Sequence, residues 1–329
     1  MSMNEKIRMA HGSGGDQTSA LIRGLFMKYF RNEWNAAMND AAVLPLSGQI
    51  AFTTDSFVVD PIIFPGGDIG RLAVCGTVND LLTSGSLPRY LSASFILEEG
   101  LPMDVLESIC VSMQATAKEA GIEIVTGDTK VVSGRGGLFI NTAGIGEIDG
   151  EPFDFGQVQV GDAILLNGTL GDHHACILSQ RMEIENDICS DVAPLVSMMK
   201  ALKAGNVRIR GMRDITRGGL ATVLSEISEQ THGALQIREK TLPVKDSVAS
   251  FCKVLGLEPL YMGNEGKAVF IVDGADAEKA KKIMQSCTYG ENAEIIGECV
   301  PGKHPVLITS VGGKRRLVPL QGEGLPRIC

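Results

Sequence analysis

The stretch FTTDSFVVDPIIFPGGDIGRLAVCGTVNDL, residues 52–81, carries two different secondary-structure signals in one short segment. Its first part is rich in β-branched and aromatic residues and predicts a strand. Its last part repeats apolar residues at helical spacing, among them Ile69, Leu72 and Val78, and predicts a helix that ends at Gly85. A strand followed by a helix is the unit from which mixed α/β folds are built.

The same alternation continues along the chain. The first half predicts further strands in segments 89–99, 122–128 and 137–148, and an amphipathic helix over 102–121 that starts at Pro102 and stops at Gly121. The second half repeats the pattern less cleanly. It predicts strands at 162–168, 268–273, 293–300 and 305–310, and helices at 173–181, 192–204, 218–230 and 277–286.

The length of 329 residues is too great for one ordinary core and favours two domains. The loop DGEPFDFGQVQVGD, near residue 153, is the best boundary. We therefore expect mixed α/β domains at 1–153 and 154–316. Residues 317–329 contain VPLQGEG, with two glycines, a proline and no helical period, and predict a mobile tail that ends in Cys329.

Composition excludes several classes of protein. The net charge of −9 argues against a general binder of nucleic acids or anionic membranes, because phosphates reward clustered Lys and Arg. The one basic run, 314–316, is short and is predicted to be a solvated strand end. The N-terminus lacks the apolar core of a signal peptide, and no apolar run approaches the roughly 18 residues of a membrane span. A soluble, cytoplasmic protein is expected.

Cysteine and histidine give no sign of a clustered metal site. The eight cysteines form no C-x-x-C pair, and the first seven are expected to be small buried hydrophobes. Cys329, the last residue, is the exception, because a terminal thiol on a tether can travel. His173 and His174 stand at a predicted helix start, where we expect surface positions and assign no role to the second histidine.

Chemistry is suggested by acidic and glycine-rich turns. No Walker A or G-x-G-x-x-G sequence is present. HGSGG, residues 11–15, predicts either a phosphate nest or a flexible arm. Any one of Asp40, Asp55, Asp80 and Asp128 could be an ordinary turn residue, but the four together, with Lys130 nearby, favour a metal–phosphate site.

Two further turns are candidates for the same site. RDITRGGLATVL places Thr216 and Arg217 before a predicted helix, where free N–H groups favour an anion; the alternative is an ordinary N-cap by Thr216. YMGNEGKAVF places Glu265 between two glycines just before a strand. Its carboxylate either fills a turn or projects into a cleft.

Taken together, AHGSGG, NDAAVL, IVTGDTKVV, RDITRGGL, NEGK and the terminal PRIC resemble the HypE family of hydrogenase maturation factors. These are carbamoyl dehydratases of the superfamily that includes aminoimidazole ribonucleotide (AIR) synthetase, selenophosphate synthetase and thiamine-monophosphate kinase. The resemblance covers essentially the whole chain. The acidic and glycine-rich segments are shared by the superfamily and imply ATP, whereas FPGGDIG and PRIC are narrower and point to HypE.

The resemblance implies a homodimer of two AIR-synthetase-like domains, with the N-terminal domain pairing with its mate. It implies that HypF places a carbamoyl group on Cys329, and that ATP with Mg²⁺ dehydrates this group to a thiocyanate. The cyanide then passes to iron on the HypC–HypD complex as a ligand of the [NiFe] hydrogenase centre. The implied residues are Cys329, Glu265 (the base) and Lys130 for catalysis, Gly12, Gly14, Gly15, Asp55, Thr216 and Arg217 for the nucleotide, and Asp40, Asp80 and Asp128 for the metal.

Two other interpretations compete with this one. A sibling kinase or synthetase would share the ATP-binding residues but has no use for Cys329, and selenophosphate synthetases need a reactive residue near the N-terminal glycines, whereas the first cysteine here is Cys75. A non-enzymatic scaffold or metal chaperone would need clustered Cys or His, although the terminal thiolate and carboxylate could bind a metal. ATP hydrolysis distinguishes these readings.

Overall fold

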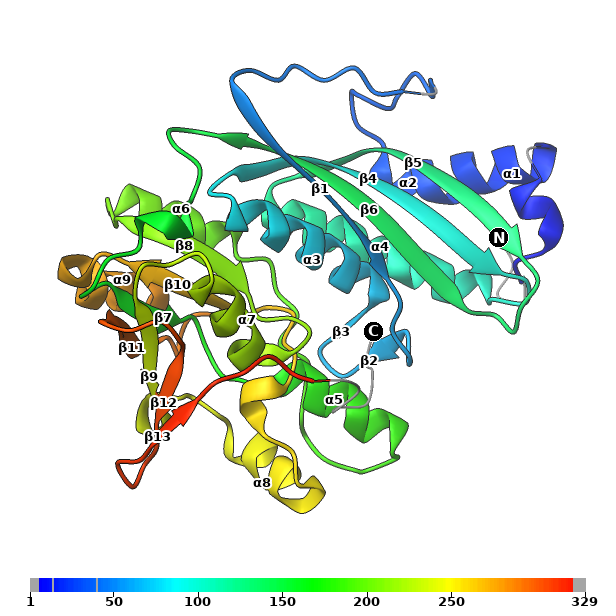
Figure 1. Ribbon diagram of the computed structural model, residues 1–329. Helices are drawn as coiled ribbons and strands as arrows, with labels where there is room; N and C mark the ends of the chain where they lie inside the picture. Colours follow the sequence, from blue (N-terminus) through cyan, green and yellow to red (C-terminus); the bar gives the residue numbers. More distant parts are fainter. Residues whose placement is uncertain (1–5, 14, 40, 322–329) are drawn as a thin grey trace.

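The first half of the chain is an antiparallel-rich sheet covered on one face by helices (Figure 1). The computed structural model describes residues 6–13, 15–39 and 41–321. The sheet has the order β1-β6-β4-β5, and within it β4 and β5 run parallel. Its strands are β1 (Gln49–Phe57), β4 (Leu87–Glu98), β5 (Glu123–Val132) and β6 (Leu138–Ile148). Its helices are α3 (Ile69–Thr83) and α4 (Met103–Ala120), with the short α1 (Asp16–Leu21) and α2 (Met27–Phe30) beside β5.

The second half is a larger sheet in the order β13-β12-β9-β11-β7-β10-β8. Its strands are β7 (Ala163–Leu166), β8 (Ile209–Asp214), β9 (Ala234–Arg238), β10 (Ala268–Val272), β11 (Glu294–Val300), β12 (Val306–Ile308) and β13 (Lys314–Arg316). Its helices are α5 (Asp172–Arg181), α6 (Val196–Ala204), α7 (Gly219–Ser228), α8 (Asp246–Leu255) and α9 (Ala277–Gln285). A two-stranded ribbon, β2 (Ile63–Phe64) with β3 (Gly67–Asp68), precedes α3.

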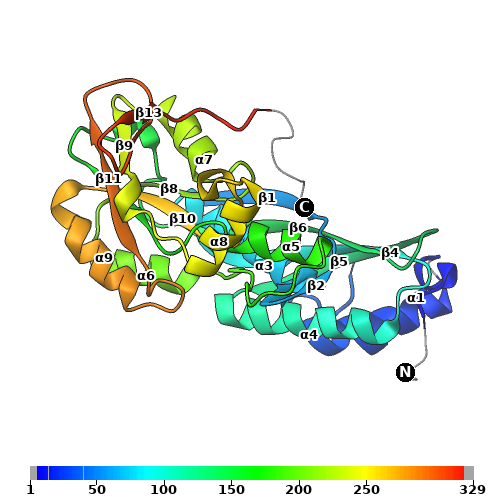
Figure 2. The same cartoon turned by 90° about the horizontal axis from the view of Figure 1, so that it is seen from below.

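The two halves meet along α3. Figure 2 shows the second half on one side of the first, with α1 at the far end. α3 packs on its own sheet and also contacts β8 and α6, and its apolar residues share one core with residues of the second half. Asn79 fixes this contact, because its amide donates to the Ala193 carbonyl at 2.9 Å and its oxygen accepts from the Leu195 N–H at 2.9 Å. α3 therefore carries residues to the junction of both halves.

The strongly patterned segments form as predicted, and the weakly patterned ones were missed. The strands and helices expected from 52–81 and from 102–121 are confirmed as β1, α3 and α4. α1, α2, β8, β9 and α8 were not anticipated. The N-terminal segment is packed rather than a loose arm over the residues described, because Ile7 is buried and its N–H bonds to the Leu101 carbonyl at 2.8 Å.

Several residue predictions were wrong. His173 and His174 are buried, not on the surface, because α5 packs between the ribbon and the second sheet's loops. Among the cysteines expected to be buried, Cys189 is exposed and Cys287 is partly exposed. Both follow loops or helix ends, where the surrounding apolar pattern stops.

The beginning of the predicted tail is attached to the second half. Leu317 is 1% exposed and its N–H bonds to the Pro305 carbonyl at 2.9 Å. The Leu320 N–H bonds to the Thr222 hydroxyl of α7 at 3.0 Å. Cys329 lies outside the described residues. No helix in the described part of the chain has the length and apolarity needed to cross a membrane.

Candidate active site

A cluster of carboxylates lies where α3 meets the loops of the second half. Asp55 comes from β1, Asp80 from α3 and Asp214 from the end of β8. The Thr53 hydroxyl donates to Asp80 at 3.3 Å. Burial, then the negative charges of Asp214 and Asp55, raise the pKa of Asp80 to about 7. Asp55 is thus close enough for its charge to act on Asp80.

Asp214 is a member of this cluster that the sequence analysis missed. Burial raises its pKa, and the charge of Asp55 adds to that effect, while the Thr216 hydroxyl lowers it by hydrogen bonding. Thr216 therefore contacts a carboxylate instead of capping α7, whose N-cap is Gly218. The predicted alternative, an N-cap by Thr216, is wrong. Arg217 is exposed beside it.

Glu265, in the loop before β10, lies near enough to the same cluster for the charges of its members to act on it. Burial raises its pKa well above the usual value, and the charges of Asp214, Asp191, Asp55 and Asp80 add to the shift. A carboxyl group so placed holds a proton far more readily than an exposed one. A carboxylate of raised pKa is a stronger base than an ordinary one, which is the property that proton abstraction requires.

The Glu265 loop is fixed by buried amides. The Asn264 oxygen accepts from the Gly171 N–H at 2.8 Å, and the Asn264 N–H bonds to the Ile215 carbonyl at 2.9 Å. On the other side of the sheet edge, the Asn167 amide donates to the Gly266 carbonyl at 3.0 Å. The NEGK segment is thus held by at least two buried side chains that sequence reasoning did not single out.

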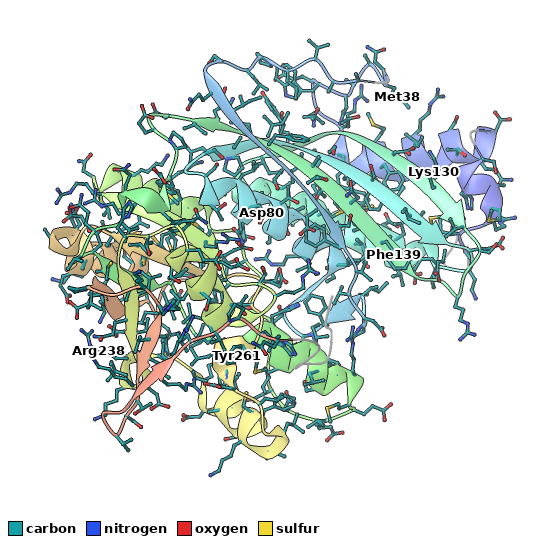
Figure 3. All side chains as sticks on the ribbon, viewed as in Figure 1. Met38, Asp80, Lys130, Phe139, Arg238 and Tyr261 are labelled. Atoms are coloured by element: carbon teal, nitrogen blue, oxygen red, sulfur yellow. The ribbon has the colours of Figure 1, made fainter. Side chains whose placement is uncertain are left out.

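Asp128 and Lys130 stand apart from this cluster. They form an exposed ion pair at 2.8 Å, which lowers the pKa of Asp128. Asp128 is in register with Ser94, Asn141 and Ser56 across the sheet, so it lies three strands, about 14 Å, from the β1 edge and on the opposite face from Asp55. Figure 3 shows Lys130 and Asp80 on separate parts of the first half. Asp128 therefore does not share one site with Asp55 and Asp80 within one chain.

Lys130 and Asp128 instead share a pocket with the N-terminal segment. This pocket, of about 330 Å³, is also lined by Gly12 and by Asn39. Gly12 lies against β5 so closely that a Cβ would come within 2.5 Å of the Val131 nitrogen. Gly15 has open space around it. Gly14 and Asp40, predicted for the nucleotide and the metal, lie outside the described residues.

The donor set fits Mg²⁺ held together with a phosphate. Among the residues described, no three Asp, Glu, His or Cys side chains are gathered into a ready metal site. Mg²⁺ usually binds through one or two carboxylates, with phosphate oxygens and water completing its shell. The charge of Asp55 contributes to the raised pKa of both Asp80 and Asp214, and a bound Mg²⁺ would stabilise these carboxylates in their charged form.

Comparison with known proteins gives the family. The N-terminal domain of AIR synthase related proteins matches residues 38–148, and the C-terminal domain of the same proteins matches 159–310. The chain is 46% identical to carbamoyl dehydratase HypE of Bradyrhizobium diazoefficiens over 99% of this chain and 97% of that protein. It is 45% identical to HypE of Escherichia coli strain K12, over 98% and 99% respectively.

Solved structures agree. A crystal structure of HypE in complex with ATP superposes with a TM-score of 0.93 and 46% identity, covering 98% of this chain and 99% of that one. HypE in a HypE–HypF complex gives a TM-score of 0.79 at 47% identity, covering 92% of this chain and 100% of that one. The chain belongs to the AIR synthase related proteins and, among them, to the HypE family of carbamoyl dehydratases.

Proposed function

We propose that this protein uses ATP to dehydrate an S-carbamoyl group on Cys329 to an S-cyanate, which supplies the cyanide ligand of [NiFe] hydrogenase iron. The observation that supports this proposal most directly concerns Glu265. Its carboxyl group has a raised pKa because it is buried near the other carboxylates at the junction of the two halves. The whole-length similarity to HypE dehydratases supports the same reaction.

The chemistry follows from the leaving group. The carbamoyl oxygen attacks the γ-phosphoryl group of ATP, ADP leaves, and the nitrogen gives up one proton. Phosphate then departs with its C–O electron pair while the nitrogen loses its second proton and C≡N forms. The carbamoyl oxygen ends in phosphate, and both nitrogen protons are released. Phosphoryl transfer needs positioning and charge neutralisation, and Glu265 is the base for the nitrogen protons.

Asp80, Asp55 and Asp214 would hold Mg²⁺ with the nucleotide, together with Asp40 and Asp128. The ion would neutralise charge on the phosphates. Gly12, Gly14 and Gly15 would present backbone N–H groups to phosphate oxygens, and Thr216 and Arg217 would contact the nucleotide from the start of α7. Lys130, paired with Asp128, would supply a cation at the transferring group.

We infer a homodimer from the open face of the first sheet. Along that face Phe52 is 67% exposed, Ile50 49% and Ile96 44%, and Phe139 of β6, labelled in Figure 3, is the cross-strand partner of Ile96. Exposed apolar side chains gathered on one sheet face favour a partner surface. A second copy offers the same face, which is the requirement of a two-fold dimer.

The dimer would also complete the site. In one chain, Asp128 and Lys130 are separated from Asp80 and Glu265 by the width of the sheet. We propose that one copy supplies Asp128 and Lys130 while the other supplies Asp80 and Glu265. HypF, present with HypE in the related complex, is the proposed carbamoyl donor, and the HypC–HypD complex the proposed cyanide acceptor.

Two variants test the reaction against the fold. Cys329→Ala should bind Mg-ATP normally but form no S-cyanate after incubation with HypF and carbamoyl phosphate. Glu265→Gln should accept the carbamoyl group and bind Mg-ATP, yet lose water at least about 10²-fold more slowly, because the base is gone. Near-normal water loss in Glu265→Gln removes it as the base; S-cyanate formation in Cys329→Ala refutes the assigned carrier.

A further inference from the structure

A hollow of about 530 Å³ lies where the chain passes from β13 into the predicted tail, and none of the proposed site residues lines it. Three segments that are far apart in the sequence form its walls: the end of α7 with the loop after it (within 225–232), the loop between β11 and β12 (302–305), and residues 316–319. Leu317 fixes the last of these, because its side chain is buried and its N–H bonds to the Pro305 carbonyl at 2.9 Å. The hollow therefore lies at the base of the segment that leads to Cys329.

The titratable side chains of this hollow are mostly basic. Its walls carry four basic residues, all of them exposed: His232, Lys303, His304 and Arg316. Glu229 is the one acidic residue among the described residues that line it. The whole chain has a net charge of −9, so the basic hollow, as we call this surface, is a local exception to the overall charge. A surface of this kind attracts a negatively charged ligand.

The two permanent cations of the basic hollow have no counter-ion in this chain. Neither Lys303 nor Arg316 forms an ion pair with another residue of the described ranges. The neighbouring Arg315 differs, because its guanidinium group pairs with Glu258. Lys303 and Arg316 come from separate segments, and the fold brings them to one hollow without an acidic partner for either. Their charges are therefore available to a ligand from outside the chain.

Protection of a sheet edge does not account for the basic hollow. β13 is the edge strand of the second sheet, pairs with β12 alone among the described strands, and has its three residues, 314–316, exposed. Basic side chains on an edge strand ordinarily keep two sheets from pairing with each other. That role needs neither a hollow nor the lysine and two histidines that two other segments contribute. The basic run at 314–316 was predicted to be a solvated strand end, and its last residue also lines a recess.

The position of the basic hollow suits a partner that acts on Cys329. The Leu320 N–H bonds to the Thr222 hydroxyl of α7 at 3.0 Å, and Figure 2 shows the segment after β13 passing beside α7. The nine residues that follow Leu320 span at most about 30 Å when fully extended. A partner seated in the hollow touches residues 316–319 and stays within this reach of the thiol. Its binding therefore raises the effective concentration of the thiol at the partner's own active site.

We propose that the basic hollow is a docking site for an acidic segment of HypF. This inference rests on the proposed function, in which HypF places the carbamoyl group on Cys329. HypF is the partner present in a solved complex with a HypE that is 47% identical to this chain. Aspartate or glutamate side chains of the docked segment would meet Lys303 and Arg316, the two cations without a counter-ion. Contacts of this kind are screened by salt, so binding weakens as the ionic strength rises.

The test is isothermal titration calorimetry of the full-length protein with purified HypF, without ATP or carbamoyl phosphate. Lys303→Glu combined with Arg316→Glu should weaken binding about tenfold or more, because attraction across the interface becomes repulsion. Lys303→Ala combined with Arg316→Ala should weaken it in the same direction by a smaller factor. The matched control, Lys240→Glu combined with Lys253→Glu, makes the same change of charge at exposed positions outside the hollow and should keep the wild-type affinity. Added salt should weaken wild-type binding more than that of the alanine pair.

The outcomes separate the docking site from the proposed function. Wild-type affinity for HypF in both hollow variants overturns the docking site, and so does an equal loss in the control, which would reveal a general effect of charge. Weaker binding of the HypC–HypD complex or of an RNA oligonucleotide, with HypF binding unchanged, also overturns it. If the wild-type protein is carbamoylated by HypF in these cases, the proposed function stands. If the wild-type protein binds no HypF at all, the proposed carbamoyl donor fails and the docking site with it.

Discussion

At the residue scale, partly buried carboxyl groups of raised pKa distinguish this molecule's junction from an ordinary domain contact. Asp80, Asp214, Glu265 and Asp191 all have raised pKa values, and in each case burial is the leading cause. Neighbouring carboxylates that are shielded from solvent repel one another and destabilise the fold. Such groups typically occur where they bind a cation or a phosphate group, or exchange a proton. We therefore assign these carboxylates to the proposed reaction site and do not expect them to stabilise the fold.

The buried histidine pair predicts loss of stability in acid. Burial lowers the pKa of His173 to about 3 and that of His174 to about 4, while the unfolded chain takes up a proton near pH 6.5. Stability is therefore complete above pH 6.5 and falls as the pH drops toward the folded values. Each histidine should cost about 2 kcal/mol of unfolding free energy between pH 6.5 and 4.5.

Urea unfolding of His173→Gln across this pH range measures the effect. The slope of unfolding free energy against pH should be shallower than in the wild type, whatever the absolute stability of the variant. His232→Gln, at an exposed position, serves as the control and should keep the wild-type slope. An unchanged slope in His173→Gln would show that His173 is not the buried neutral group described.

At the element scale, the N-terminal segment is attached to the sheet by a close backbone contact. Met9–Gly12 forms a short 3₁₀-helix against β5, and Gly12 meets Val131 there. This contact places Gly12, one of the predicted nucleotide-binding glycines, in the pocket of Asp128 and Lys130. The segment is an ordered part of the first half over the residues described, and so it can present backbone N–H groups in fixed directions.

Gly12→Ala should loosen this attachment. The added methyl group would overlap the Val131 backbone. Such overpacking typically lowers the free energy of unfolding by about 1–3 kcal/mol. Hydrogen exchange of the Ile7 amide, which is bonded to Leu101, should become about tenfold faster or more. Gly15→Ala adds its methyl group to open space and should leave this amide unchanged. Equal exchange in both variants would contradict the contact.

The elements that could be predicted from sequence are those whose apolar residues repeat at the spacing of a helix or a strand. α4 repeats apolar residues on one face between Pro102 and Gly121, and the structure places it where expected. β8, with the sequence IRGMRD, has three charged residues and no alternation of apolar with polar side chains, and it becomes a strand because it pairs with β10. Asp214 was missed for this reason. Asp191 was missed because its segment has no regular sequence pattern. Its place in the structure is seen only from its contact with the Glu265 backbone N–H.

At the scale of the whole molecule, the open sheet face and the divided site lead to the same dimer. The turns that predicted one metal–phosphate site from sequence are separated in a single chain, with Asp128 on one face and Asp55 on the other. Sequence motifs indicate which residues belong to a site. They do not indicate which of the two chains of a dimer supplies each residue. Two copies paired through the sheet would reunite them.

Phe52→Asp should separate the dimer. A charge in the middle of an apolar interface leaves an unpaired buried ion, so sedimentation velocity should show a shift from dimer to monomer at micromolar concentration. Val254→Asp changes an apolar side chain of α8 that is more exposed still, and should leave the dimer intact. A dimer that survives Phe52→Asp lies on another surface.

Mixed dimers test whether the site is shared. Lys130→Ala and Glu265→Gln should each be inactive alone. When the two variants are unfolded and refolded together, half of the dimers are mixed and each of these has one intact site, so about a quarter of wild-type sites should return. If each site were formed within one chain, the mixed dimers would recover no activity.

The most direct measurement is intact-protein mass spectrometry of the wild-type chain after incubation with HypF, carbamoyl phosphate and ATP, before and after addition of more Mg-ATP. We expect the gain of one carbamoyl group followed by the loss of one water, both confined to the peptide that ends in Cys329. An unmodified Cys329 in a protein that still hydrolyses ATP would contradict the dehydratase and leave only the ATP-binding fold.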